Sequence, residues 1–270
     1  MKNFNETEQI HEQYKTSANL NSRMRLHQLY STNQTGWSSW VFNQYRLSSN
    51  QSVLELGCGT GYIWHENSDK IPDHLSLILS DFSNSMLESA KTNTSELRNI
   101  DYHVIDAQAI PFKDNSFDVV IANHMLYHVP DIDKALKEIT RVLKAEGIFY
   151  ATTLGENNMK ELVSLLFDFD GQIDLAMDSV TNTFGLESGK ELLSSFFESV
   201  EMRRYEDSLH ITEPQPLIDY ILSTQGIGNV TDIITGDRVK EFENYIIQLF
   251  NKKGYIDIVK DAGMIISQSK

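Results

Sequence analysis

Short apolar runs alternate with helical patterns along the middle of the chain. Such runs, ended by Gly, Ser or Asp, are typical of buried strands. They occupy residues 52–56, 75–79, 102–105, 117–122 and 148–153. Between residues 131 and 144 the apolar positions instead recur at i, i+3, i+4 and i+7, which predicts an amphipathic helix, ended by Gly147. Strands alternating with helices predict a parallel sheet covered on both faces.

The pattern is less regular outside this middle part. Residues 1–50 read as polar helices carrying aromatic side chains, which we interpret as an N-terminal helical lid. Beyond residue 153 we expect helices at 155–169, 187–199 and 237–250 and strands at 200–211 and 255–267. The main domain is therefore predicted at 51–270, with helical cap insertions at about 155–186 and 213–252. These insertions form either a cap over a substrate or an appendage that covers a sheet edge.

The composition of the chain limits the classes of molecule that it is expected to bind. The 270 residues are 40% hydrophobic, enough for a sizeable core, and the net charge is −15. That charge disfavours nucleic acids and anionic membranes, since the basic residues gather only weakly, at Lys15, Arg23 and Arg25. Cys58 is the single cysteine, and we find neither an apolar leader nor a run of about 18 apolar residues. We therefore expect a cytoplasmic protein, a monomer or a homodimer.

The strongest local signal is a glycine-rich loop, Glu55-Leu56-Gly57-Cys58-Gly59-Thr60-Gly61, between a predicted strand and a predicted helix. Glycines allow positive φ and close approach of the backbone to a ligand. The dinucleotide fingerprint G-x-G-x-x-G would need glycine at Tyr62, and no Walker A lysine follows. A buried Glu55 beside the loop disfavours a pyrophosphate and suits a cationic group. This charge pattern favours S-adenosylmethionine (SAM), which carries an ammonium and a sulfonium.

The loop resembles motif I of the class I SAM-dependent methyltransferases, E/D-x-G-x-G-x-G. Residues 110–118 resemble the "lPf-d-sFD" stretch of the ubiquinone/menaquinone-biosynthesis, or type 11, group. The resemblance implies an α/β fold: a Rossmann-like, doubly wound, mostly parallel seven-stranded sheet with helices on both faces and an antiparallel last strand. An N-terminal helical lid and a helical insertion near the C-terminus complete the expected fold.

The resemblance also implies a set of cofactor-binding residues at the ends of successive strands. Asp81, 24 residues after Gly57, corresponds to the acid that binds the ribose hydroxyls, and Asp106 to the acid near the adenine amino group. Phe82 and Met86 either flank the adenine or belong to the core. The remaining candidates are Glu55, Gly57, Cys58, Gly59, Gly61, Ala107 and Asn123, with Arg25 or Tyr30 expected to reach the SAM carboxylate.

The predicted activity is transfer of the methyl group of SAM to a small-molecule acceptor, through an oxygen, nitrogen or carbon atom left open. His128, with His124, is the candidate base or acceptor-orienting group, the alternative being a wall of the pocket. No metal site is predicted, since these two histidines lack the His-Glu-x-x-His pattern. Two other functions stay open: a SAM-binding protein without methyltransferase activity, and a nucleotide-dependent oxidoreductase.

Overall fold

The computed structural model describes residues 25–224 and 228–270. Lys15, Arg23 and the first part of the predicted lid lie outside the described residues. The described chain divides into two compact units. One comprises residues 37–155, 181–205 and 262–270; the other comprises the described parts of residues 1–36, 156–180 and 206–261. The predicted lid and cap boundaries remain predictions.

Seven strands form one sheet in the order β3-β2-β1-β4-β5-β7-β6. Their bounds are β1 Ser52–Leu56, β2 Ser76–Asp81, β3 Ile100–Val104, β4 Phe117–Asn123, β5 Leu143–Leu154, β6 Ser199–Ile211 and β7 Ile256–Gln268. Strands β1 to β5 pair in parallel, and β7 is antiparallel to β5. The predicted mostly parallel seven-stranded sheet with an antiparallel last strand is confirmed.

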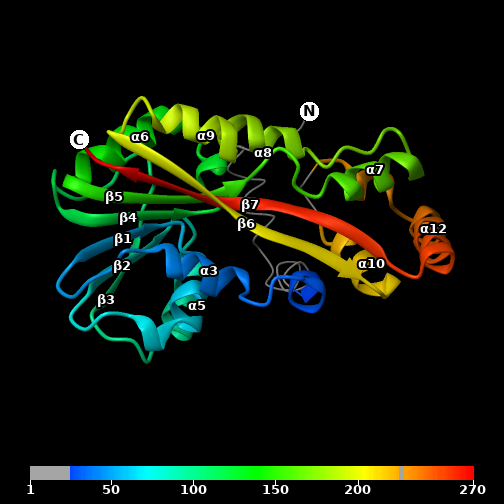
Figure 1. Cartoon of the computed structure of the whole chain (residues 1–270), viewed down its shortest axis with the longest axis horizontal. Coiled ribbons are helices and arrows are strands. Elements are labelled where there is room, and N and C mark those ends of the chain that lie inside the picture. The colour runs from blue at the N-terminus through cyan, green and yellow to red at the C-terminus, as the bar shows by residue number, and fades with distance from the viewer. Residues whose placement is uncertain (1–24, 225–227) are drawn as a thin grey trace. The chain divides into compact units, whose positions relative to one another are not determined.

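Helices cover both faces of the sheet in the unit of residues 37–155, 181–205 and 262–270. Figure 1 shows α6 and α9 on one side of the sheet and α3 and α5 on the other. The helices of this unit are α3 Trp37–Gln44, α4 Tyr62–Glu66, α5 Asn84–Asn93, α6 Ile132–Val142 and α9 Leu186–Leu193, with 3₁₀ helices at Ser68–Lys70 and Leu126–His128. Apolar side chains of α3 and α4 pack with those of β1, β2 and β4 into one core.

The second unit is mostly helical and has its own core. Its helices are α7 Lys160–Phe169, α10 Pro214–Leu222, α11 Val230–Ile233 and α12 Asp237–Lys253, and α8 Met177–Phe184 runs across the boundary of the two units. The helix predicted at 237–250 is confirmed: Phe242, Ile246 and Phe250 are buried, and Val239 and Leu249 pack against the same core.

The boundary between α6 and β5 differs from the prediction. Asp131 caps α6 by accepting a hydrogen bond from the Lys134 amide (3.0 Å), but the helix ends at Val142, and β5 begins at Leu143 rather than at Ile148. The cause is a register shift in the β4–β5 pairing, where Leu143 already lies opposite Phe117. Gly147 does not end the helix; a Cβ there would lie 2.8 Å from the Lys144 carbonyl oxygen.

Candidate functional site

The glycine loop leaves β1 and adopts left-handed backbone angles at each glycine of the motif. Gly57, Gly59 and Gly61 have φ values of 67°, 55° and 69°. A Cβ on Gly57 would lie 2.8 Å from the Cβ of Met125, whereas nothing lies within 4 Å of a Cβ on Gly59. The loop is therefore packed against the chain after β4 at Gly57 and open at Gly59, where a ligand has room.

Asp81 at the end of β2 ties this loop to the neighbouring strand. Its Oδ2 accepts a hydrogen bond from the Gly59 amide (2.9 Å), and its Oδ1 accepts one from the Ser83 amide (2.8 Å). The half-buried Cys58 donates its amide to the Ser80 carbonyl (2.8 Å), which adds a second link to β2. Burial raises the pKa of Asp81, although the hydrogen bonds from Ser83 and Gly59 oppose the shift.

Glu55 lies in β1 with an exposed fraction of only 2%. Its Oε2 accepts a hydrogen bond from the Trp64 indole N–H (2.5 Å), and its Oε1 accepts one from the side-chain amide Nδ2 of Asn123 (2.7 Å). Both donors are neutral. Burial raises the pKa of Glu55 to about 7, because hydrogen bonds from neutral groups offset only part of the loss of water.

Asn123, the last residue of β4, connects Glu55 to further groups. The same Nδ2 donates to the Tyr45 hydroxyl (2.8 Å), and Oδ1 accepts from the Thr152 hydroxyl (3.3 Å). The Thr152 hydroxyl in turn accepts a hydrogen bond from the His124 amide (3.1 Å). A chain of hydrogen bonds thus runs across the carboxyl ends of β1, β4 and β5, the edge at which ligands bind in such sheets.

Four candidates, Phe82, Met86, Asp106 and Ala107, follow the carboxyl ends of β2 and β3. Phe82 is half exposed and Met86 is partly buried on α5, while Ala107 is buried. Asp106 accepts hydrogen bonds from the amide (2.9 Å) and side chain (3.0 Å) of Gln108, so its carboxylate is oriented by a local turn. The predicted contacts of these four residues with adenine remain predictions.

The two histidine candidates follow β4 and lie among aromatic rings. His124 has φ 49°, and its ring centre is 5.1 Å from that of Trp37. His128 ends the 3₁₀ helix Leu126–His128, and its ring centre is 4.6 Å from that of Tyr127. Both histidines are partly buried, which permits either predicted role, base or pocket wall.

Arg25 and Tyr30 belong to the second unit. Arg25 is exposed in the helical residues 25–30, and Tyr30 is partly buried against that unit's core. The pKa of Tyr30 is raised, first by burial and then by the charge of Glu213. Their predicted reach to the SAM carboxylate remains a prediction.

Sequence patterns did not single out three side chains of this site, Tyr45, Trp64 and Thr152. Trp64 is fully buried as the one buried side chain of α4, and Tyr45 is 9% exposed. An aromatic residue in the first turn after the glycine loop was a usable signal for Trp64. Tyr45 offered none, because its partner Asn123 is 78 residues away in the chain.

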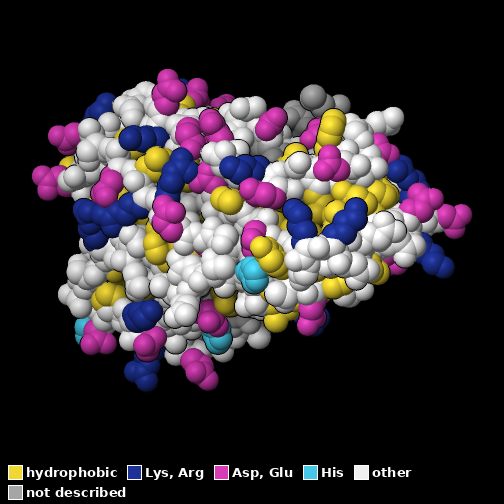
Figure 2. Space-filling view, turned by 45° about the vertical axis from the view of Figure 1, so that its right-hand side comes forward, with side chains coloured by type: hydrophobic (Ala, Val, Ile, Leu, Met, Phe, Trp, Pro, Cys, Tyr) yellow, Lys and Arg dark blue, Asp and Glu magenta, His cyan; other side chains and the backbone are white. Residues whose placement is uncertain are grey.

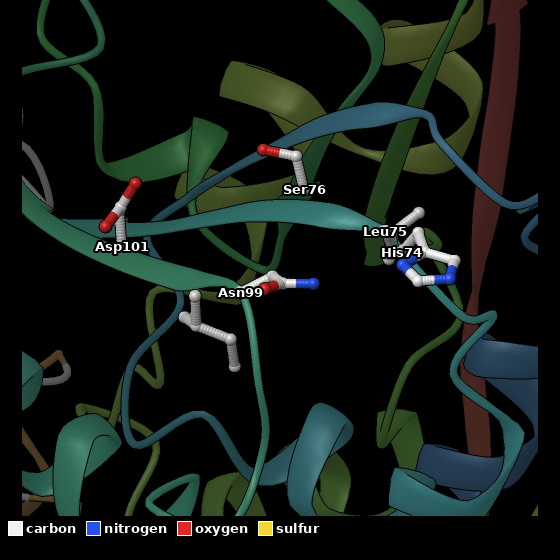
Figure 3. Close-up of a pocket in the computed structure, with 6 residues that line it drawn as sticks. His74, Leu75, Ser76, Asn99 and Asp101 are labelled. Carbon is white, nitrogen blue, oxygen red and sulfur yellow. The ribbon is translucent and has the colours of Figure 1, made fainter.

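A depression of about 380 Å³ lies elsewhere, at the amino ends of β2 and β3. It is lined by residues 74–76 and 99–101, and Figure 3 shows the side chains of Ser76, Asn99 and Asp101 pointing in different directions. Because ligands bind at the opposite ends of strands in this type of sheet, the depression is not the functional site.

Three further features bear on function: metal-binding groups, membrane-spanning helices and charged patches. Within residues 25–224 and 228–270 no group of three or more His, Cys, Asp or Glu side chains is arranged to hold a metal ion. Over the same residues, no helix combines the length and apolarity needed to span a membrane. On the face in Figure 2, Lys and Arg side chains are interspersed with Asp and Glu.

Comparison with known proteins points to one family. The profile described as "Methyltransferase domain" matches residues 54–151. The ubiquinone/menaquinone biosynthesis C-methyltransferase UbiE of Rickettsia prowazekii is 42% identical over 106 residues, which are 37% of this chain and 43% of that protein. The demethylmenaquinone methyltransferase of Staphylococcus saprophyticus is 30% identical over 166 residues, covering 60% of this chain and 70% of that protein.

Among solved structures, the YcgJ protein of Bacillus subtilis superposes with a TM-score of 0.58 at 18% identity, covering 86% of this chain and 97% of that one. At this identity the likeness shows the fold alone. The family profile and the sequence relatives show the class: the chain belongs to the class I SAM-dependent methyltransferases, in the UbiE-like group. The matched region of the Rickettsia relative is less than half of that protein.

The donor set of the site fits SAM. Within the described part of the chain, the buried Glu55 accepts its hydrogen bonds from two neutral groups, Trp64 and Asn123, so a cation beside it would stabilise its ionised form. The open space at Gly59 gives a ligand access to the loop backbone. A pyrophosphate, in contrast, would meet the negative charges of Glu55 and Asp81.

Proposed function

We propose that this protein transfers the methyl group of SAM to a small-molecule acceptor, at an oxygen, nitrogen or carbon atom that stays open. One observation carries the proposal. The buried Glu55 lies beside a left-handed glycine loop whose Gly59 amide is bonded to Asp81, the acid that ends the next strand. Family membership and this donor set point to the same cofactor.

Most of the candidate side chains have a defined role in this proposal. Glu55 would accept the ammonium group of SAM, and Asp81 would bind the ribose hydroxyls with the carboxylate that also holds Gly59. Asp106 and the Ala107 amide would bind the adenine edge, with Phe82 and Met86 beside its faces. Arg25 or Tyr30 would bind the carboxylate of SAM.

When bound, SAM supplies a methyl group on a positively charged sulfur, which leaves as a neutral thioether. The protein then has to align the acceptor and exclude water. For a hydroxyl or an acidic C–H, His128 would take the proton or orient the acceptor, with His124 beside it. Loss of the pH dependence of turnover in His128→Ala would support the base role.

The names of the relatives guide the search for the acceptor. Two of them are named for ubiquinone or menaquinone biosynthesis and for demethylmenaquinone. Demethylated quinols are therefore the first acceptors to screen here. We further propose a cytoplasmic location and a monomer or homodimer. The net charge of −15 supports the proposal that the protein has no nucleic-acid partner.

Calorimetric titration tests the cofactor. Wild-type protein should bind SAM and S-adenosylhomocysteine (SAH) and ignore NADH. Asp81→Ala should lower SAH affinity by roughly 10- to 100-fold, the value of hydrogen bonds to a charged group. Asp101→Ala, which removes an exposed carboxylate from β3, is the matched control and should bind as the wild type does.

The outcomes separate the functions still open. Binding of NADH in place of SAH would favour an oxidoreductase and contradict the proposal. Tight SAH binding without labelled-methyl transfer to any quinol, phenol, amine or carboxylate acceptor would favour a SAM-binding protein without this activity.

A further inference from the structure

Trp64 and Asn123, which come from two different elements, each donate a hydrogen bond to one carboxylate oxygen of Glu55. Trp64 comes from α4, directly after the glycine loop, and Asn123 ends β4. The indole donates to Oε2 at 2.5 Å and the amide donates to Oε1 at 2.7 Å. With both oxygens bound, the plane of the carboxylate is fixed.

The two donors are themselves held in place. Trp64 has no exposed surface, and its ring lies against Tyr45 at 6.3 Å with an interplanar angle of 23°. Asn123 also donates to the Tyr45 hydroxyl and accepts from Thr152, so both ends of its amide are used. Neither side chain can turn without breaking a buried contact.

Apolar packing alone would not require this arrangement. Among residues 25–224 and 228–270, the hydrogen-bond donors to this buried carboxylate are the neutral Trp64 and Asn123. Burying a carboxylate with neutral partners costs more free energy than burying an apolar side chain of similar size. Fixed orientation is useful, however, when a ligand supplies the missing cation, because the acceptor then needs no reorganisation on binding.

We propose that Trp64 and Asn123 are positioning residues that orient the Glu55 carboxylate to receive the ammonium of the amino-acid part of SAM. The inference rests on the proposed function. It also divides the cofactor site: the ammonium is recognised through the β1–α4–β4 network, while the adenosine part is recognised by the residues after β2 and β3. The Asn123–Thr152–His124 chain links this network to the candidate acceptor side.

Two probes separate these parts. SAH carries the amino-acid group, whereas 5′-methylthioadenosine has the adenosine and sulfur without it. In Trp64→Phe, which keeps an aromatic ring and removes the N–H donor, SAH affinity should fall by about tenfold. Affinity for methylthioadenosine should change by less than about twofold. Trp40→Phe, at a partly buried tryptophan of the same core, should change neither.

Asn123→Ala provides a second, smaller change and should give the same selective loss of SAH. Equal losses of SAH and methylthioadenosine in both variants would show a merely structural role and overturn the inference, as would unchanged SAH affinity. Failure of the wild-type protein to bind SAH would instead overturn the proposed function itself. Circular dichroism of each variant confirms that the compared proteins are folded.

Discussion

The ionisation of Glu55 makes the stability of the folded protein depend on pH. Its pKa in the folded protein is about 7, above the ordinary value of 4.5, because of burial. The folded state therefore holds this proton more tightly than the unfolded state does. The resulting contribution to stability is present below about pH 4.5 and is lost as the pH rises through about 7.

Glu55→Gln isolates this contribution. Between pH 4.5 and 8 the wild-type free energy of unfolding should fall by roughly 3 kcal/mol relative to the variant, which has no proton to lose. Urea unfolding of the ligand-free proteins, followed by circular dichroism at four pH values, measures the difference. Parallel pH profiles would contradict the raised pKa that burial gives this carboxylate.

The residues that sequence patterns found are those with a local signature. Glu55 and Asp81 lie at the carboxyl ends of β1 and β2, and Gly57 follows β1 directly. Their order along the chain, the acidic charge beside the glycines and the resemblance to motif I indicated the cofactor class. Tyr45 and Thr152 reach the same site through contacts made by the finished sheet. Thr152 lies opposite Asn123 only because of the β4–β5 register, which a one-residue slip would change.

At the scale of elements, the β1–α4 loop offers a matched pair of glycines. Gly57→Ala combines a left-handed φ with a Cβ 2.8 Å from that of Met125, whereas Gly59→Ala has similar backbone strain and open space. We expect Gly57→Ala to lower the free energy of unfolding by about 2–4 kcal/mol and Gly59→Ala by about 1 kcal/mol.

For ligand binding, Gly59→Ala is the informative variant of the pair. In Gly59→Ala the new methyl group enters the space that we assign to the ligand, so SAH binding should weaken although the fold is nearly intact. Thermal unfolding and calorimetry on the same samples separate the two effects. Equal stability of both variants would mean that Met125 moves away from Gly57 without cost.

Element boundaries show where local patterns stop being informative. Strands β1 and β4 were predictable because their apolar runs are buried on both faces of the sheet. The end of α6 was not, because Leu143 reads equally well as the last apolar residue of a helix or the first of a strand. Its pairing with Phe117, and the register shift after it, decide between the two.

At the scale of the whole molecule, β6 and β7 each contribute residues to both compact units. Residues 206–211 of β6 and 256–261 of β7 belong to the mostly helical unit, and Asp207 lies among them. Its buried carboxylate accepts hydrogen bonds from the Ser31 hydroxyl (2.5 Å), the Asn33 amide (2.9 Å) and Lys260. Burial alone would raise the pKa of Asp207, but the bonds from Lys260 and Ser31 lower it.

The contacts of Asp207 with Ser31, Asn33 and Lys260 allow a test of whether the two units unfold independently. Asp207→Ala removes the acceptor of the bonds from Ser31, Asn33 and Lys260, which should destabilise the helical unit by about 3 kcal/mol. Hydrogen exchange should then lose protection in α10, α12 and residues 206–211, while β1 and β4 keep theirs, because those strands belong to the other core. Glu88→Ala, which breaks an exposed pair with Lys91, should change protection nowhere by more than about 0.5 kcal/mol. Equal loss of protection in both units would mean that they unfold as one cooperative body, and the glycine loop would then depend for its stability on the unit that carries Arg25 and Tyr30.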